Sequence, residues 1–178
     1  MEEIIIRVAV LEDAGGIAWV HGRARQTAYI GLLPEERLKN LDESYDQRIE
    51  DWRERLSDPA SGLAMFVAED GGEVVGIAGG NKESSGDWRF DGELQMIYIL
   101  EEYQQQGIGR WLVREVALAL MERAMRSMIV WVFKDSPYRT FYEALGGVYV
   151  GEKEHEIWGV KYKLAGYGWE NLADLTGE

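Results

Sequence analysis

Cysteine is absent from this chain of 178 residues, and histidine and proline are scarce, with two and three residues. Without cysteine the chain cannot form a disulfide, bind a metal through thiolates or carry an acyl group on a cysteine nucleophile. The two histidines, His21 and His155, lie far apart in the sequence, so we expect no metal site built on histidine. The sequence therefore predicts chemistry that uses neither a protein thiol nor a bound metal.

Basic residues are also few, with 19 lysines and arginines against 32 acidic residues and a net charge of −13. Such a charge repels polyanions, so we expect no nucleic-acid partner, and it attracts cationic partners such as amines. The same excess also serves solubility alone. No apolar run approaches the roughly 20 residues that span a bilayer, and Met1-Glu2-Glu3 lacks the basic start of a secretory signal. These features predict a cytoplasmic protein with no membrane partner.

The length predicts one domain over residues 1–178, because domains average about 150 residues and no repeat or linker interrupts the chain. Hydrophobic periodicity predicts an α/β protein in which short strands alternate with amphipathic helices. The expected strands are 4–10, 63–69, 74–80, 93–100, 128–133, 148–156 and 160–164. The expected helices are 13–29, one or two helices within 35–58, one ending near residue 126, and 137–145.

The segment from Gln104 to Arg110 reads Gln-Gln-Gln-Gly-Ile-Gly-Arg and lies between an apolar strand and an amphipathic helix. Glycine lets the backbone approach a ligand closely, and the free N–H groups of a first helical turn attract anions. The pattern therefore predicts a phosphate site, with an ordinary tight turn as the alternative. A dinucleotide fingerprint would need a third glycine where Leu112 stands, and the Gly-Lys-Ser/Thr of a Walker loop is absent.

Two motifs together resemble the GNAT superfamily of N-acetyltransferases. The first is Gln-x-x-Gly-x-Gly at residues 104–109, preceded by Ile-Tyr-Ile-Leu-Glu-Glu-Tyr at 97–103, which resembles the family's acyl-CoA pyrophosphate loop. The second is Asp-Ser-Pro-Tyr-Arg-Thr-Phe-Tyr-Glu-Ala-Leu-Gly-Gly at 135–147, which resembles its closing motif. The resemblance implies a single GNAT-like domain, with a central, mostly antiparallel twisted sheet flanked by helices.

The resemblance also implies that acetyl-CoA is the acyl donor and assigns residues to it. The backbone of the fourth strand would bind the pantetheine arm, and the glycine loop would hold the pyrophosphate through main-chain N–H groups. Ser136 stands where the family commonly has asparagine, so its contact with the donor would differ. The implied donor-binding residues are Ile97, Tyr98, Ile99, Gln104, Gln105, Gln106, Gly107, Ile108, Gly109, Arg110 and Ser136.

Two residues are candidates for catalysis. Tyr142, the tyrosine of Phe-Tyr-Glu, is the implied general acid, because a phenol with a pKa near 10 can protonate a thiolate leaving group. Its helical spacing with Phe141 and Leu145 also suits core packing. Glu93 is the candidate base; strand alternation would place it on one face with Gln95 and Ile97. The alternative is a solvated glutamate at a strand end, and a bulge in this strand, which is common in the family that the sequence resembles, would change the facing.

The acceptor pocket would involve aromatic residues of the first two helices and a later loop, namely Trp19, Tyr29, Trp52 and Trp88. Core packing is the alternative for each. We expect transfer of an acetyl group to a primary amine of a small molecule or peptide, and the acidic charge suits a polyamine-like acceptor. The alternatives are transfer to a hydroxyl, transfer of a longer acyl group, or a non-catalytic CoA-binding sensor. The apolar segment 164–169 could pair across a homodimer or close the sheet.

Overall fold

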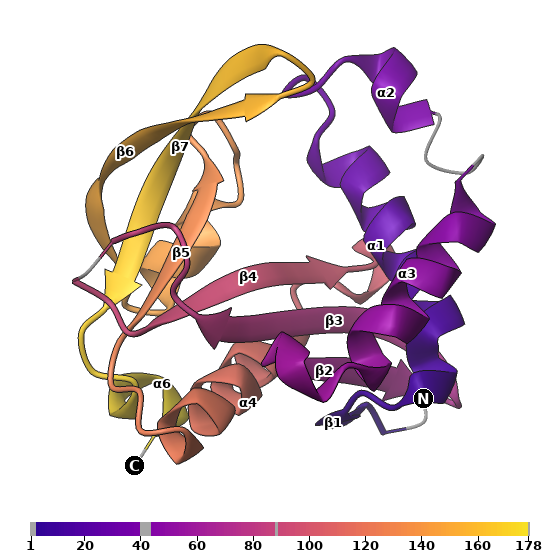
Figure 1. The fold of residues 1–178 in the computed structure, drawn as a ribbon, viewed down its shortest axis with the longest axis horizontal. Coiled ribbons are helices and arrows are strands. Elements are labelled where there is room, and N and C mark those ends of the chain that lie inside the picture. Colours follow the sequence, from indigo (N-terminus) through magenta and orange to yellow (C-terminus); the bar gives the residue numbers. More distant parts are fainter. Residues whose placement is uncertain (1–2, 40–43, 88, 178) are drawn as a thin grey trace.

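A computed structural model describes residues 3–39, 44–87 and 89–177, and shows one mixed seven-stranded sheet with helices on both faces (Figure 1). The strand order is β1-β2-β3-β4-β5-β7-β6. The strands are β1 Ile5–Val8, β2 Ala64–Asp70, β3 Glu73–Lys82, β4 Gly92–Ile99, β5 Met128–Phe133, β6 Val148–Ile157 and β7 Val160–Trp169. The helices are α1 Ala14–Ala28, α2 Glu35–Lys39, α3 Tyr45–Ser57, α4 Ile108–Glu122, α5 Arg139–Ala144 and α6 Ala173–Thr176.

The predicted order of strands and helices is confirmed, and the charged segment 35–58 forms two helices rather than one. The hairpin between β2 and β3 turns at Gly71 and Gly72, whose φ angles are 57° and 90°. A two-residue hairpin turn of this kind needs positive φ at both central positions, which glycine adopts without steric cost. The sheet is antiparallel except for the β4–β5 pair, as the family resemblance implies.

Helices α1 and α3 cover one face of the sheet, and α4 covers the other. On the α1 face, a β carbon added to Gly16 would lie 2.8 Å from the Val74 side chain of β3. On the α4 face, a β carbon added to Gly80 of β3 would overlap Val116. Glycine is therefore required where these two helices approach the central strand most closely.

Strands β4 and β5 separate after a short parallel contact. They pair at only two positions, Gly92 with Met128 and Glu93 with Ile129. Beyond these positions β4 continues beside β3, and β5 continues beside β7. Figure 1 shows the two strands diverging from this point. The sheet thus has an opening between the carboxyl-terminal parts of β4 and β5.

A bulge in β4 overturns the predicted facing of Glu93. Gly79 pairs with Met96 but Gly80 pairs with Leu94, so Gln95 is an extra residue in β4. A bulge reverses the alternation of side chains beyond it. Glu93 therefore lies on the face opposite to Ile97, and the prediction that both share a face with Gln95 is wrong.

The segment 164–169 forms the end of β7, where it pairs with β5 on one side and β6 on the other. Leu164, Ala165, Tyr167 and Trp169 are buried there. Of the two alternatives, the structure shows this segment closing the sheet within one chain. A homodimer formed through another surface stays a prediction.

Replacing Gly168 of β7 with alanine should destabilise the fold, because the new β carbon would overlap the ring of Phe90. We expect a loss of about 1–3 kcal/mol, which lowers the melting temperature by several degrees. Gly15→Ala in α1 is the control, since the nearest atom to its β carbon is 3.9 Å away and alanine favours helix. Thermal unfolding of both variants measures the effect, and equal melting temperatures would contradict the close packing of Phe90 on β7.

Candidate active site

The backbone of β4 presents polar groups to the opening. The N–H of Leu100 donates to the carbonyl of Val75 on β3 at 3.0 Å. In an antiparallel pair, alternate residues turn their N–H and C=O groups toward the same neighbour. Ile97 and Ile99 therefore turn theirs away from β3, toward the side where β5 has separated. This placement supports the prediction that their backbones bind an extended ligand arm.

The glycine loop follows a short 3-10 helix at Glu101–Tyr103 and leads into α4. Two of its residues, Gln105 and Gly107, have positive φ angles of 59° and 86°. The side-chain amide of Gln104 donates to the carbonyl of Ile99 at 3.1 Å, and that of Gln106 donates to the carbonyl of Glu102 at 2.9 Å. These two glutamines hold the loop in shape, so its ligand contacts would come from the main chain.

The main-chain N–H groups of this loop have no partner elsewhere in the described part of the chain, from Gln105 to Arg110. They precede or begin α4, where the helix dipole is positive, so together they have the arrangement of a cradle that the sequence predicts for phosphate oxygens. Gly109 also allows close packing, since its β carbon would lie 3.0 Å from the Phe141 ring and 3.3 Å from Ile99. The Arg110 side chain is exposed on α4.

Tyr142 is held in the core by α5. It is 7% exposed and stacks on Tyr167 of β7, with ring centres 6.3 Å apart. Tyr167 pairs with Val130, the neighbour of Ile129 on β5, so it lies on the face opposite to Glu93. Burial, and secondarily the neighbouring Tyr29, raise the pKa of Tyr142 well above its usual value. The phenol therefore stays protonated at physiological pH, and the raised pKa makes it a weaker acid than an exposed tyrosine.

A pair of tyrosines spans the opening on the α1 face. The hydroxyl oxygens of Tyr29, at the end of α1, and Tyr98, on β4, are 2.7 Å apart. The ring of Tyr29 also packs edge-on against Phe133 of β5, with centres 5.2 Å apart. Burial, followed by the proximity of Tyr29, raises the pKa of Tyr98. The sequence predicted only the backbone of Tyr98 as a site element; the bulge at Gln95 is what turns its side chain to the same face as Glu93.

Glu93 lies at the apex of the opening, where β4 and β5 part. It is half-buried, and this burial raises the pKa of its carboxyl group; Lys153 opposes the shift and Glu83 adds to it. The ammonium of Lys153 lies 4.2 Å from the centre of the Trp131 ring on β5. Glu93 is thus a carboxylate that binds a proton more readily than an exposed glutamate, which suits a general base near neutral pH.

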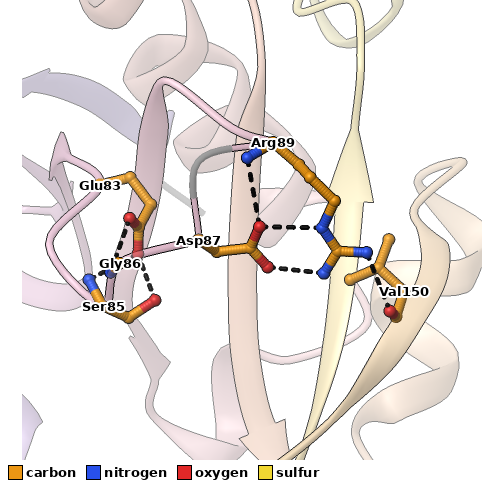
Figure 2. Close-up of polar contacts among 6 residues, drawn as sticks. All are labelled: Glu83, Ser85, Gly86, Asp87, Arg89 and Val150. Carbon is orange, nitrogen blue, oxygen red and sulfur yellow. Dashed lines mark hydrogen bonds and ion pairs between the residues drawn. The ribbon is translucent and has the colours of Figure 1, made fainter.

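The loop between β3 and β4 is tied to β6 (Figure 2). Asp87 accepts from Arg89 Nε at 2.8 Å and from Nη2 at 2.6 Å, and Arg89 Nη1 donates to the carbonyl of Val150 on β6 at 3.2 Å. Glu83 accepts from the backbone N–H groups of Ser85 and Gly86 at 2.6 and 3.1 Å. These contacts hold the described residues of the loop, 83–87 and 89, in place next to β6.

The aromatic residues predicted for an acceptor pocket separate into different environments. Tyr29 lies at the opening, as described above. Trp19 is 49% exposed and packs edge-on against Tyr45 of α3. Trp52 is 3% exposed and lies in the core beside His21, which favours the core-packing alternative for this residue. Trp88 lies outside the described residues.

Ser136 is buried just before α5, and its hydroxyl oxygen accepts from the backbone N–H of Tyr138 at 3.2 Å. This contact orders the turn into the helix that carries Tyr142. Across residues 3–39, 44–87 and 89–177 no group of three or more acidic, histidine or cysteine side chains is arranged to hold a metal. Within the same ranges no helix is both long and apolar enough to cross a membrane.

The sequence of the chain matches a known family. Residues 27–147 fit the sequence pattern of the acetyltransferase (GNAT) family. The chain belongs to this family. A curated relative from Bacillus subtilis, named as the uncharacterized N-acetyltransferase YuaI, is 38% identical over 173 residues, which is 97% of this chain and 96% of the relative.

Solved structures show the same fold. The PaiA N-acetyltransferase of Thermoplasma acidophilum, in complex with coenzyme A, aligns with a TM-score of 0.68 at 17% identity and covers 92% of this chain and 98% of its own. The putative acetyltransferase YncA of Salmonella typhimurium, with acetyl-CoA, also gives 0.68, at 18% identity over 96% of this chain and 95% of its own. The predicted family, fold, enzyme class and acetyl-CoA donor are thereby confirmed.

Replacing Gly107 with alanine should weaken coenzyme A binding by this acetyltransferase. The β carbon meets no atom within 4 Å, but φ is 86°, so alanine would shift the backbone and misalign the N–H cradle. We expect the dissociation constant for coenzyme A, measured by calorimetry, to rise roughly tenfold. Gly159→Ala at the β6–β7 turn is the matched control, with φ of 77° and equally open surroundings. Equal weakening in both variants would show that the loop geometry does not determine affinity.

Proposed function

We propose that this enzyme transfers the acetyl group of acetyl-CoA directly to a primary amine of a small molecule or peptide, within a ternary complex. One observation carries the proposal: the opening between β4 and β5 is approached by a basic carboxylate, Glu93, on one face and by a protonated phenol, Tyr142, from the other. Acceptor and donor can therefore meet between a group that takes a proton and a group that gives one.

The two groups balance the protons of the reaction. Glu93 accepts a proton from the attacking amine, through water where the amine does not reach it, while the nitrogen bonds to the thioester carbonyl carbon. Backbone N–H groups of β4 stabilise the charge on the carbonyl oxygen. As the carbon–sulfur bond breaks, Tyr142 gives its proton to the departing sulfur and regains one from solvent. A CoA-binding protein with this fold but no turnover is the alternative.

Tyr142→Phe should remove turnover and leave coenzyme A binding intact, because the ring still packs on Tyr167 while the proton donor is lost. We expect thiol release from acetyl-CoA to fall roughly 100- to 10,000-fold. The acceptor panel should contain spermidine, free amino acids, aminoglycosides and short peptides. Tyr149→Phe is the control, because this half-exposed tyrosine packs edge-on against Tyr167 without being buried.

Equal thiol release in the native protein and in Tyr142→Phe would show that Tyr142 only packs. Coenzyme A binding with no release for any amine in the panel would favour the non-catalytic alternative.

Lys153→Met should move the acidic limb of the pH profile to higher pH. Glu93 acts as a base only when deprotonated, so kcat/KM falls as the pH drops through its pKa. Lys153 lowers that pKa, and removing its charge raises it further. The profile of each variant is measured with one acceptor, and Glu93→Gln should abolish this limb. The control is Lys161→Met, which removes an exposed lysine paired with Glu154 at 3.6 Å and should leave the pH profile as in the native protein. If the acidic limb of Lys153→Met does not move either, Glu93 is not the base.

The overall charge of the chain bears on the choice of acceptor. The net charge of −13 favours a cationic acceptor such as a polyamine, on the basis of overall charge alone. Location in the cytoplasm and assembly as a homodimer also stay predictions.

A further inference from the structure

Positive charge gathers on the α1–α3 side of the opening, against the overall charge of the chain. Burial, and then the charges of Arg25, Arg48 and Arg55, lower the pKa of His21 to about 3. The Arg48 guanidinium lies against α1, 2.8 Å from where a β carbon of Gly22 would stand, and that of Arg55 lies 4.6 Å from the centre of the Trp52 ring. His21 is therefore neutral, and three arginines set the local charge.

Arg25 is the member of this group that lies against Tyr29, and among the described residues its charge has no counterion. Its guanidinium carbon lies 5.6 Å from the centre of the Tyr29 ring, and its buried Nε has no hydrogen-bond partner among the described residues. Within that part of the chain it forms no ion pair, whereas Arg7 bonds Asp13 and Glu69 at 2.7 Å each. Stacking on a ring leaves the N–H groups of a guanidinium unsatisfied.

The position of Arg25 places this free cation beside the path of the acceptor. Arg25 precedes Tyr29 by one turn of α1, and its charge acts on Tyr98 of β4. Tyr98 and Glu93 share the α1 face, while Tyr142 and α5 occupy the other face. An amine that reaches Glu93 therefore approaches from the side on which Arg25 lies.

We propose that the acceptor carries a carboxylate or phosphate group and that Arg25 binds this group while the amine points toward Glu93. The inference rests on the proposed function and specifies its substrate class. A guanidinium presents parallel N–H donors that match the oxygens of either anion. A polyamine would gain nothing at Arg25 and would be repelled by it.

The test compares acceptors that differ only in the anion. One series pairs glycine, β-alanine, 4-aminobutyrate and 6-aminohexanoate with their amides, and a second pairs phosphoethanolamine with ethanolamine. Spermidine is included as the cationic probe. Each is titrated by calorimetry into the protein saturated with coenzyme A, and thiol release from acetyl-CoA is measured in parallel. The proteins are the native chain, Arg25→Gln, Arg25→Lys and, as matched control, Arg23→Gln, an exposed arginine of the same helix.

We expect at least one anionic acceptor to bind roughly 10- to 100-fold more tightly than its uncharged partner. Arg25→Gln should abolish this preference, Arg25→Lys should retain part of it, and Arg23→Gln should leave it unchanged. The series that shows the preference identifies the anion as carboxylate or phosphate.

Three results would overturn the proposal: equal binding of the anionic and uncharged partners in both series, tighter binding of spermidine than of any anionic acceptor, or a preference that survives in Arg25→Gln. A loss of coenzyme A affinity in Arg25→Gln with no change in acceptor preference would assign Arg25 to the donor instead. A preference without thiol release would leave the inference standing and refute the transferase reaction, whereas release without a preference would refute the inference alone.

Discussion

The two-residue contact between β4 and β5 is the constraint on which the site depends. A strand inside a sheet satisfies its backbone groups on both sides, and a strand that loses a neighbour leaves one row of donors and acceptors without partners. In β4 that row includes the backbone groups of Ile97 and the N–H of Ile99, whose carbonyl instead accepts from the Gln104 side chain. It leads directly to the glycine loop, whose N–H groups also have no partner among the described residues. The separation of β4 from β5 thus leaves a continuous row of polar backbone groups that runs from the edge of β4 to the start of α4.

Electrostatics at the site differ from those of the molecule as a whole. The chain carries a net charge of −13, yet the α1–α3 side of the opening holds three arginines and a histidine that stays neutral. Long-range attraction depends on the total charge, and salt screens it over about 10 Å. Recognition depends on the few groups that touch the ligand. The total charge therefore does not identify the acceptor, and the proposal for Arg25 rests instead on local contacts.

The sequence predicted the architecture well because the signals involved are local. The glycines at 71 and 72, the apolar strand at 128–133 and the glycine loop each specify their conformation through a few neighbouring residues. The facing of Glu93 could not be read in this way, because the bulge at Gln95 appears only when β4 is paired with β3. Arg25 was missed for a similar reason: its significance lies in having no counterion among the described residues, which depends on packing between distant segments. The spacing of Tyr142 favoured core packing and the family motif implied a catalytic role; the structure shows Tyr142 buried beside the opening, and its catalytic role stays a prediction.

Because α4 lies so close to β3, the residue tolerated at one position depends on the residue at another. The methyl group of Val116 occupies the space in which a β carbon of residue 80 would lie, so the two residues share one volume. A change at either position alone would leave a cavity or cause an overlap, and each costs stability. In diverging relatives, a larger residue at 80 should appear only together with a smaller one at 116. This pair would then covary, although neither residue contacts a substrate.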